Sequence, residues 1–257
     1  MLRAAIVGLG SWGQTLVGLV QGRSEDMRFT RAYTPNASKA QAFCSAQGIG
    51  LATSYEAVLA DPAVDAVVLA TPNSQHESQV RQAAAAGKHV FVEKPLALTR
   101  AGARAALTAV ERAGVTLGVG LNRRFHPSMR ELQRRVTSGE LGTIGSVIAE
   151  LTATTGFHRT AGSWRTRPEE EPAGAMACIG THLVDAMIWM LGRVRDVHCI
   201  AGHRGGPHGN DTTSLLLRFE SGATGHAYCS VVAARNFRFA AYGTRGFAEV
   251  LAPGMDT

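Results

Sequence analysis

The fold is decided by the stretch Gly8-Leu9-Gly10-Ser11-Trp12-Gly13, which lies between the apolar run 4–7 and the apolar-rich segment 14–20. Three glycines at this spacing are a weak signal in a chain with 29 glycines, but their place between a predicted strand and a predicted helix makes it strong. Glycines there permit a tight turn and let backbone amides approach a pyrophosphate at the positive end of the helix. The stretch therefore predicts a dinucleotide-binding Rossmann domain in which residues 8–13 contact the cofactor and Trp12 covers its nicotinamide end. A glycine-rich turn without a ligand is the alternative.

A second predicted strand, residues 28–33, ends where the adenine ribose of such a cofactor would lie. NAD enzymes usually place Asp or Glu here, which accepts hydrogen bonds from the ribose hydroxyls. This chain instead reads Thr34-Pro35-Asn36-Ala37-Ser38-Lys39, so no carboxylate would repel a 2′-phosphate. We therefore favour NADP over NAD, with Thr34, Asn36 and Lys39 as cofactor contacts. The alternative is a polar loop in which Asn36 or Ser38 caps the next helix.

Strand–helix alternation continues to residue 121. The predicted helices cover residues 55–60, 77–86 and 99–113, and the predicted strands cover residues 66–70, 89–92 and 115–119. In a doubly wound parallel sheet, ligands bind beyond the carboxyl ends of the strands. The polar loop that follows strand 66–70, with Thr71, Pro72, Asn73 and His76, is therefore predicted to line the cofactor site.

The strand 89–92 ends in Glu93-Lys94-Pro95. A lysine at the end of a buried strand loses part of its hydration, which disfavours the charged ammonium and allows proton exchange near neutral pH. Only three of the 26 Lys and Arg residues are lysines, so Lys94 stands out as the candidate proton-transfer group, with Glu93 beside the cofactor. The alternative is an ordinary surface lysine that follows a strand.

The pattern changes after residue 121, so we predict two domains, residues 1–121 and 122–257. Two helices, 128–138 and 176–191, accompany a series of strands joined by glycine-containing turns. These strands cover residues 144–152, 194–201, 212–219, 223–232, 237–243 and 247–251. The sequence thus predicts an α/β protein: an N-terminal Rossmann domain with a doubly wound parallel sheet, followed by an α+β domain with a mostly antiparallel sheet.

Charge and composition restrict the partners. The formal net charge of +6 is spread along the chain and aromatic residues make up 6%, which argues against nucleic acid and favours anionic small molecules. No apolar run is long enough to cross a membrane, and Met1-Leu2-Arg3 leads directly into a strand, so we expect no signal peptide or anchor. The four cysteines lack Cys-x-x-Cys spacing, which predicts no metal site, no disulfide framework and a cytoplasmic location.

The chain resembles the glucose–fructose oxidoreductase, inositol dehydrogenase and rhizopine-catabolism family (Gfo/Idh/MocA). The motifs that carry the resemblance occur in family order over nearly the whole chain: Gly8 to Gly13, Ala70-Thr71-Pro72-Asn73 with His76, Glu93-Lys94-Pro95, Asn122-Arg123-Arg124-Phe125, Gly139-Glu140-Leu141-Gly142, and Gly180-Thr181-His182-Leu183-Val184-Asp185. The resemblance implies a bound nicotinamide cofactor and hydride transfer at an oxygen-bearing carbon of a sugar, polyol or cyclic alcohol.

The same resemblance implies roles for individual residues. Lys94 matches the family lysine that contacts substrate and cofactor, and His182 matches the histidine that acts as acid or base at the reacting oxygen. A capped helix histidine is the alternative for His182. The remaining candidates for the substrate site are Asn122, Arg124, Trp164, Arg165, Cys178 and Asp185. For Asp185 we favour a structural role, as a partner of the backbone or of an arginine near the substrate.

Two features depart from the family pattern. Many members carry an aspartate four residues before the catalytic histidine, and this chain has Cys178 there, which leaves a cofactor-binding sensor or regulator without turnover as the rival function. The chain also stops at Thr257, earlier than family members usually do, as a fragment or a shortened variant would. A sheet cut short would expose an edge or an apolar face, so we expect a homo-oligomer.

Overall fold

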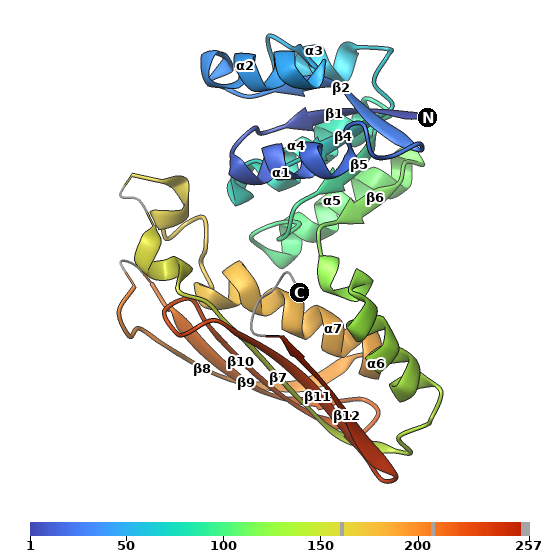
Figure 1. Cartoon of the computed structure of the whole chain (residues 1–257), viewed down its shortest axis with the longest axis vertical. Helices are drawn as coiled ribbons and strands as arrows, with labels where there is room; N and C mark the ends of the chain where they lie inside the picture. Colours follow the sequence, from blue (N-terminus) through green and yellow to red (C-terminus); the bar gives the residue numbers. More distant parts are fainter. Residues whose placement is uncertain (160–161, 207–208, 253–257) are drawn as a thin grey trace. The chain divides into compact units, whose positions relative to one another are not determined.

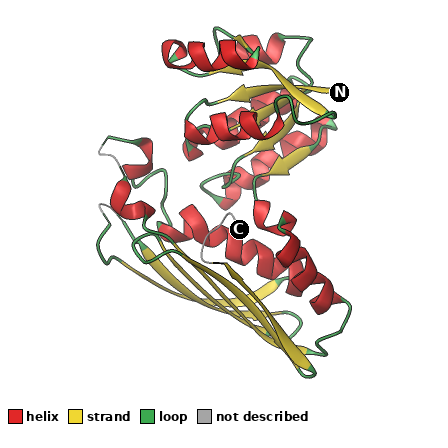
Figure 2. Ribbon diagram, viewed as in Figure 1, coloured by secondary structure: helices red, strands yellow, loops and turns green. Residues whose placement is uncertain are grey.

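The computed structural model describes residues 1–159, 162–206 and 209–252. The chain divides into two units, Met1–Gly120 and Leu121–Thr257. Each unit contains one six-stranded sheet, and Figure 2 distinguishes the sheets from the helices that cover them. In the described part of the chain, no helix combines the length and the apolar character that crossing a membrane requires.

The first unit alternates strands and helices. Its elements are β1 (Leu2–Val7), α1 (Ser11–Val20), β2 (Met27–Tyr33), α2 (Ala37–Gln47), β3 (Gly50–Leu51), α3 (Tyr55–Ala60), β4 (Ala66–Leu69), α4 (Asn73–Ala85), β5 (His89–Val92), α5 (Arg100–Ala113) and β6 (Leu117–Val119). The parallel sheet has the order β3-β2-β1-β4-β5-β6, so the strand order reverses between β1 and β4. This is the Rossmann order, and it confirms the predicted fold class.

Consecutive residues of the central strands are apolar, so both faces of this sheet carry apolar side chains, and helices cover both faces. Along β1, Ala4 and Ile6 pack into one core cluster with Val17 of α1, whereas Ala5 and Val7 pack into a second cluster with helices α3 to α5. The carboxyl ends of β1, β2, β4 and β5 emerge at one edge of the sheet, since Val7 pairs with both Tyr33 and Leu69, and Leu69 pairs with Val92.

The start of α4 is the boundary in this unit that differs most from the prediction. Residues 73–76 are the first turn of α4 rather than part of a loop, so the helix begins four residues before the predicted Glu77. Pro72 precedes its first residue at φ −56°. Pro72 is the N-cap, where the missing backbone N–H of proline removes no hydrogen bond within the helix.

The second unit is built on a mixed sheet. Its elements are η1 (Asn122–Phe125), α6 (Pro127–Thr137), β7 (Ile144–Thr152), η2 (Thr155–His158), η3 (Trp164–Thr166), η4 (Met176–Gly180), α7 (Thr181–Leu191), β8 (Val194–Gly202), β9 (Thr212–Phe219), β10 (Thr224–Ser230), β11 (Asn236–Gly243) and β12 (Gly246–Ala252). The sheet order is β12-β11-β7-β10-β9-β8, and β7 and β10 are the parallel pair within otherwise antiparallel pairing. The predicted mostly antiparallel sheet is therefore confirmed.

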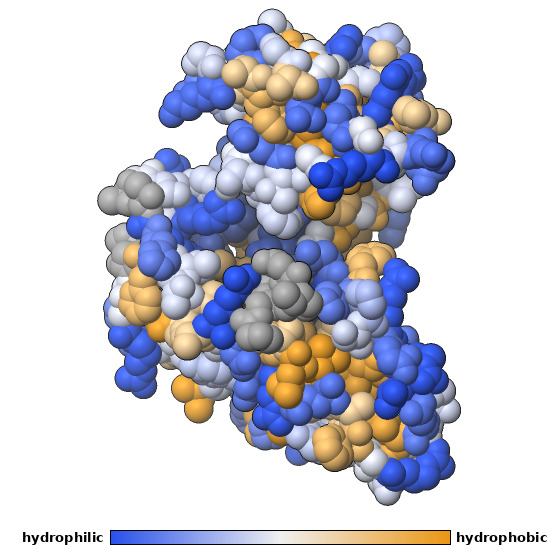
Figure 3. Space-filling model, in the orientation of Figure 1, coloured by the Kyte–Doolittle hydropathy of each residue, from blue (hydrophilic) through white to orange (hydrophobic). Residues whose placement is uncertain are grey.

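Helices α6 and α7 lie on one face of this sheet (Figure 1). Met129 of α6 and Met187 of α7 are fully buried with Phe239 of β11, and they form one core with the inward residues of the sheet. Apolar side chains on the opposite face remain exposed, including Ile200 at 78% and Leu251 at 64%. Hydrophobic and hydrophilic surface alternate over the visible side of this unit (Figure 3).

The predicted single helix 176–191 consists of two parts. Met176–Gly180 is a π-helical turn, and the α-helix α7 follows from Thr181. A Cβ on Gly180 would lie 2.6 Å from Met176 Cε and 2.7 Å from Cys229 Sγ, so the turn packs closely against β10. Single π turns are found frequently at functional sites.

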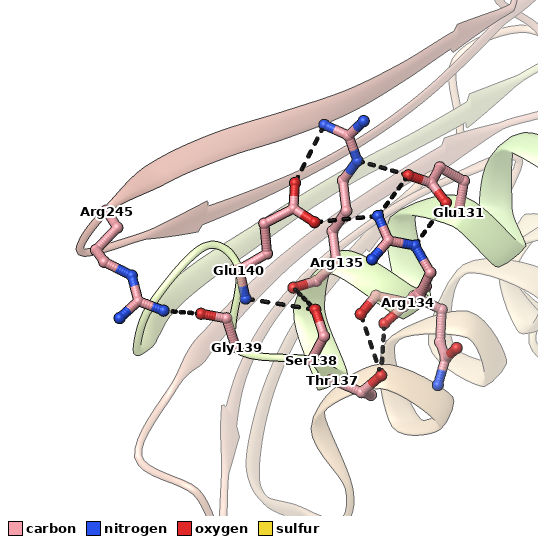
Figure 4. Close-up of polar contacts among 9 residues, drawn as sticks. Glu131, Arg134, Arg135, Thr137, Ser138, Gly139, Glu140 and Arg245 are labelled. Atoms are coloured by element: carbon pink, nitrogen blue, oxygen red, sulfur yellow. Dashed lines mark hydrogen bonds and ion pairs between the residues drawn. The ribbon is translucent and has the colours of Figure 1, made fainter.

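The sequence Gly139-Glu140-Leu141-Gly142 ends α6 and has a structural role (Figure 4). Gly139 and Gly142 have positive φ values of 75° and 77°, which glycine adopts without strain. Around this turn Arg134 and Arg135 bind Glu131 and Glu140, and Arg245 donates to the Gly139 carbonyl. These charges are exposed, so the ion pairs stabilise the fold only slightly.

Candidate functional site

The glycine loop lies at the point where the strand order of the first sheet reverses. Gly8 follows β1 with φ +95°, and a Cβ there would lie 2.5 Å from the Ala70 carbonyl oxygen after β4. A Cβ on Gly13 would lie 1.9 Å from the Gly8 carbonyl oxygen, so α1 crosses directly over the loop. Both positions therefore require glycine for close packing of backbone on backbone.

Gly10 differs from the other two glycines because a Cβ there would meet nothing within 4 Å. Gly10 is the N-cap of α1, and the first turn of this helix contains no acidic residue. The amides of a helix N-terminus carry partial positive charge and have no partner within the helix. Open space beside them fits a pyrophosphate, so the residues present fit the dinucleotide that the sequence predicts. Ser11 and Trp12 are exposed beside this space, whereas Leu9 is buried in the core.

The loop after β2 is exposed from Pro35 to Lys39. Asn36 lies at the N-cap position of α2 without a side-chain hydrogen bond to the helix backbone, and its Oδ1 accepts a hydrogen bond from Ser38 Oγ at 2.9 Å. The Lys39 side chain lies in the first turn of α2, on the surface. Among the described residues 34–39 there is no carboxylate, so the loop presents neutral polar groups and one cation.

Three of the residues after β4 are buried, namely Thr71, Asn73 and His76. Thr71 Oγ1 donates to Gln79 Oε1 at 2.6 Å, and Asn73 is 7% exposed in the first turn of α4. His76 is fully buried, with Nδ1 2.7 Å from the Pro95 carbonyl oxygen and Nε2 3.1 Å from the Thr71 carbonyl oxygen. His76 therefore links the loop after β4 to the turn that contains Lys94.

Glu93 and Lys94 follow β5 at the same sheet edge and are half-buried. The Glu93 carboxylate lies against Gly120, where an added Cβ would approach Oε1 to 2.7 Å. The Lys94–Pro95 peptide bond is cis. The sheet thus brings together the cofactor candidates of the first unit, because all of them follow the carboxyl ends of β1, β2, β4 and β5.

The remaining candidates belong to the second unit. The Arg124 guanidinium binds Asp185 of α7 through two hydrogen bonds, Nε to Oδ2 at 2.7 Å and Nη2 to Oδ1 at 2.6 Å. This pairing raises the pKa of Arg124, and the same guanidinium lies 5.8 Å from the centroid of the Trp189 ring. Asp185 thus anchors Arg124 of η1, while Asn122 of the same turn is exposed.

His182 is 8% exposed in the first turn of α7, and Cys178 lies in the preceding π turn. Two further residues, which no sequence motif marks, lie in this region. Arg159 Nη2 donates to Glu171 Oε2 at 2.6 Å and to Cys178 Sγ at 3.5 Å. The thiol at the position of the family aspartate therefore faces a guanidinium that is already paired with a carboxylate.

Trp164 and Arg165 form the turn η3, in which the Arg165 guanidinium lies 4.2 Å from the centroid of the Trp164 ring. Arg159 Nη1 donates to the Arg165 carbonyl oxygen at 2.7 Å and so holds this turn. No sequence periodicity marks the loop, so nothing in the sequence could have identified Arg159 or Glu171. In the described residues, no group of three or more His, Cys, Asp or Glu side chains forms a potential metal site.

Comparisons with known proteins cover both units. Residues 2–121 match the family described as "Oxidoreductase family, NAD-binding Rossmann fold", and residues 129–249 match the "GFO/IDH/MocA C-terminal domain". The scyllo-inositol 2-dehydrogenase (NAD(+)) of Bacillus subtilis is 30% identical over 89% of this chain and 67% of its own length. The D-xylose 1-dehydrogenase (NADP(+)) 2 of Haloferax volcanii is 33% identical over 72% of this chain and 57% of its own length.

The comparison with solved structures also finds a dehydrogenase that matches nearly the whole chain. The WlbA dehydrogenase of Bordetella pertussis, crystallised with NADH and UDP-GlcNAcA, has a TM-score of 0.91 and 25% identity over 99% of this chain and 79% of its own. The matches span 40% to 67% of the lengths of the first four curated relatives. The two matched domains, the Rossmann strand order and the glycine loop together place the chain in the Gfo/Idh/MocA family of NAD(P)-binding oxidoreductases.

Proposed function

We propose that the protein transfers hydride between NAD(P) and an oxygen-bearing carbon of a sugar, polyol or cyclic alcohol or ketone. The observation that carries the proposal is the glycine loop at the reversal of strand order, where Gly10 leaves open space at the N-terminus of α1. Relatives named for scyllo-inositol and D-xylose support this substrate class.

The bound nicotinamide would supply the hydride chemistry. Hydride leaving a carbinol carbon must be matched by loss of the hydroxyl proton, which requires a positioned acid or base. We assign this proton transfer to Lys94 and His182. Substrate orientation is assigned to polar, aromatic and cationic groups of the second unit: Asn122, Arg124, Trp164, Arg165, Cys178 and Asp185.

A panel of polyols, sugars and keto-sugars, assayed by NAD(P)H absorbance, tests the proposal. Turnover of at least one class at 1 s⁻¹ or faster is expected, the lower end of ordinary enzyme rates, about 1–1,000 s⁻¹. The rival function is a sensor that binds the cofactor without turnover, and Cys178 beside Arg159 is the observation that favours it. Cofactor binding with no turnover across the panel would support the sensor.

We predict tighter binding of NADPH than of NADH, because residues 34–39 offer no carboxylate and Lys39 is exposed there. Lys39→Ala should weaken NADPH binding on the order of tenfold and leave NADH binding nearly unchanged, since only NADPH carries the 2′-phosphate. Titration by fluorescence quenching measures both affinities. Equal affinities that do not respond to the substitution would contradict the prediction.

We also propose a homo-oligomer formed through the sheet face of the second unit that faces away from α6 and α7. Cross-strand register places Ile200, Leu216, Tyr228 and Leu251 on this face, and all four are exposed. Exposed apolar side chains on a sheet face favour association. Light scattering over a wide concentration range should give a dimer or larger assembly, and a stable monomer would contradict the proposal.

A further inference from the structure

The second unit contains a surface pocket of about 160 Å³ between Arg159, residues 165–175 and residues 209–211, which precede β9. Its apolar floor includes Ala175 and Val231, and three arginines, Arg159, Arg165 and Arg167, line it. Two acidic residues, Glu171 and Asp211, line it as well. Which of these charges remain available to a ligand decides what the pocket can bind.

The Glu171 carboxylate and the Arg159 guanidinium are engaged with each other. Their side chains are 7% and 12% exposed, and Arg159 Nη2 lies 2.6 Å from Glu171 Oε2. The second terminal nitrogen of Arg159 binds the Arg165 carbonyl oxygen at 2.7 Å. Arg159 and Glu171 therefore cancel in charge and act as a support that fixes η3 at the edge of the pocket.

The Asp211 carboxylate is also engaged. It accepts hydrogen bonds at 2.8–2.9 Å from the amides of Arg204, Gly205 and Gly206, and one at 3.0 Å from Thr212 Oγ1. Burial alone would raise the pKa of Asp211, but these bonds lower it to about 2. Asp211 thus stays ionised at neutral pH, and its oxygens are occupied by the amides of the loop 204–206 and by His203, whose Nδ1 lies 3.3 Å from Oδ2.

Two cations remain. Arg165 and Arg167 are exposed at either side of Thr166, and in the described ranges 1–159, 162–206 and 209–252 neither guanidinium makes an ion pair. Arg165 is oriented by the Trp164 ring, and the Arg167 amide donates to the Trp164 carbonyl oxygen at 3.1 Å. We infer that this pocket binds the carboxylate or phosphate of a ring-shaped substrate, with Arg165 and Arg167 as the charged contacts.

Size and geometry agree with this ligand class. A cavity of about 150 Å³ accommodates one benzene ring, which is smaller than a sugar ring with its substituents. A pocket of about 160 Å³ therefore has room for the anionic group and the adjoining atoms of the substrate, and not for the whole sugar. Guanidinium groups bind planar carboxylates and phosphates through paired hydrogen bonds. The inference rests on the proposed function, because it names an acidic or phosphorylated sugar as the substrate class of that activity.

Isothermal titration of the intact chain, saturated with cofactor, tests the inference with D-glucuronate, D-glucose 6-phosphate and neutral D-glucose. At least one anionic sugar should bind on the order of tenfold tighter than glucose at low ionic strength, since a charge-assisted bond is added. Raising the salt concentration should reduce this preference, because exposed charges are screened. A preference for glucuronate alone identifies a carboxylate site, and one for glucose 6-phosphate alone identifies a phosphate site.

Arg165→Gln with Arg167→Gln should reduce the ratio of anionic to neutral affinity to about one, and each single substitution should reduce it partly. The control is Arg195→Gln, which removes the same charge from β8 at a side chain that is 69% exposed and outside the pocket lining. Equal binding of glucose and both anions, an unchanged ratio in the double variant, or an equal loss in the control would overturn the inference. Failure of the proposed function would give a different result from failure of this inference. If anionic sugars bound more tightly but no sugar were turned over, only the proposed hydride transfer would be refuted.

Discussion

Gly13→Ala is expected to lower the Tm of the first unit by roughly 10 °C. The added methyl group would lie 1.9 Å from the Gly8 carbonyl oxygen, and this neighbour is backbone that cannot rotate away. Overpacking costs about 1–3 kcal/mol, and contact with backbone places this substitution near 3 kcal/mol. At a few degrees per kcal/mol for a unit of this size, the shift is roughly 10 °C. Circular dichroism or differential scanning calorimetry measures it.

Gly10→Ala is the matched control, three residues away in the same loop. Its Cβ would meet nothing within 4 Å and its φ of −67° suits alanine, so the Tm should stay within about 2 °C of the parent. Cofactor affinity should nevertheless fall, because the methyl group would occupy the space where we place the pyrophosphate. If Gly10→Ala were as unstable as Gly13→Ala, or if Gly13→Ala left the Tm unchanged, the assignment of backbone packing to Gly13 and of cofactor space to Gly10 would be wrong.

Much of the first unit could be predicted from the sequence because its signals are local. The apolar run of β4 is bounded by turn residues, and the glycine loop lies between a strand and a helix, so both were recognised with their order. Helix α2 and the two-residue strand β3 were not assigned. In α2 only Ala40 and Cys44 are buried, and this narrow face leaves almost no periodic pattern.

The second unit shows where local patterns stop being informative. The strands were assigned correctly, but the parallel pairing of β7 with β10 depends on contacts between residues about 80 positions apart. The π turn before α7 depends on the fit of Gly180 against Cys229 of β10, a tertiary contact. Periodicity within either segment carries neither piece of information.

The sequence predicts those residues of the candidate site that belong to a motif, and it does not predict their contacts. The place of His76 after a predicted strand and the resemblance both indicate the cofactor site, but only the fold shows that it is fully buried between two carbonyl oxygens. Arg159 and Glu171 lie in an irregular loop, 19 and 7 positions before Cys178, and no spacing rule connects such residues. Tertiary packing alone brings these three side chains together.

Lys94→Ala is expected to remove most turnover, while His182→Ala should cost less. Lys94 follows a strand of the rigid sheet, and its turn is tied to α4 through His76 and the Pro95 carbonyl oxygen. His182 follows a π turn in which Cys178 replaces the family aspartate and contacts Arg159. A thiol orients and charge-stabilises an imidazole less well than a carboxylate does, so the acid–base contribution of His182 should be smaller.

Positioned acid–base groups contribute about 10²- to 10⁴-fold in rate, and we expect Lys94→Ala to lower kcat within this range with cofactor affinity nearly intact. Lys88→Ala is the matched control, because this lysine belongs to the same unit and its Nζ binds the carbonyl oxygens of Asp61 and Val64. Cys178→Asp should raise kcat if the family chemistry is latent here. All four variants are compared on the substrate that the panel reveals. Near-normal kcat for Lys94→Ala together with an inactive His182→Ala would show that the two roles are reversed.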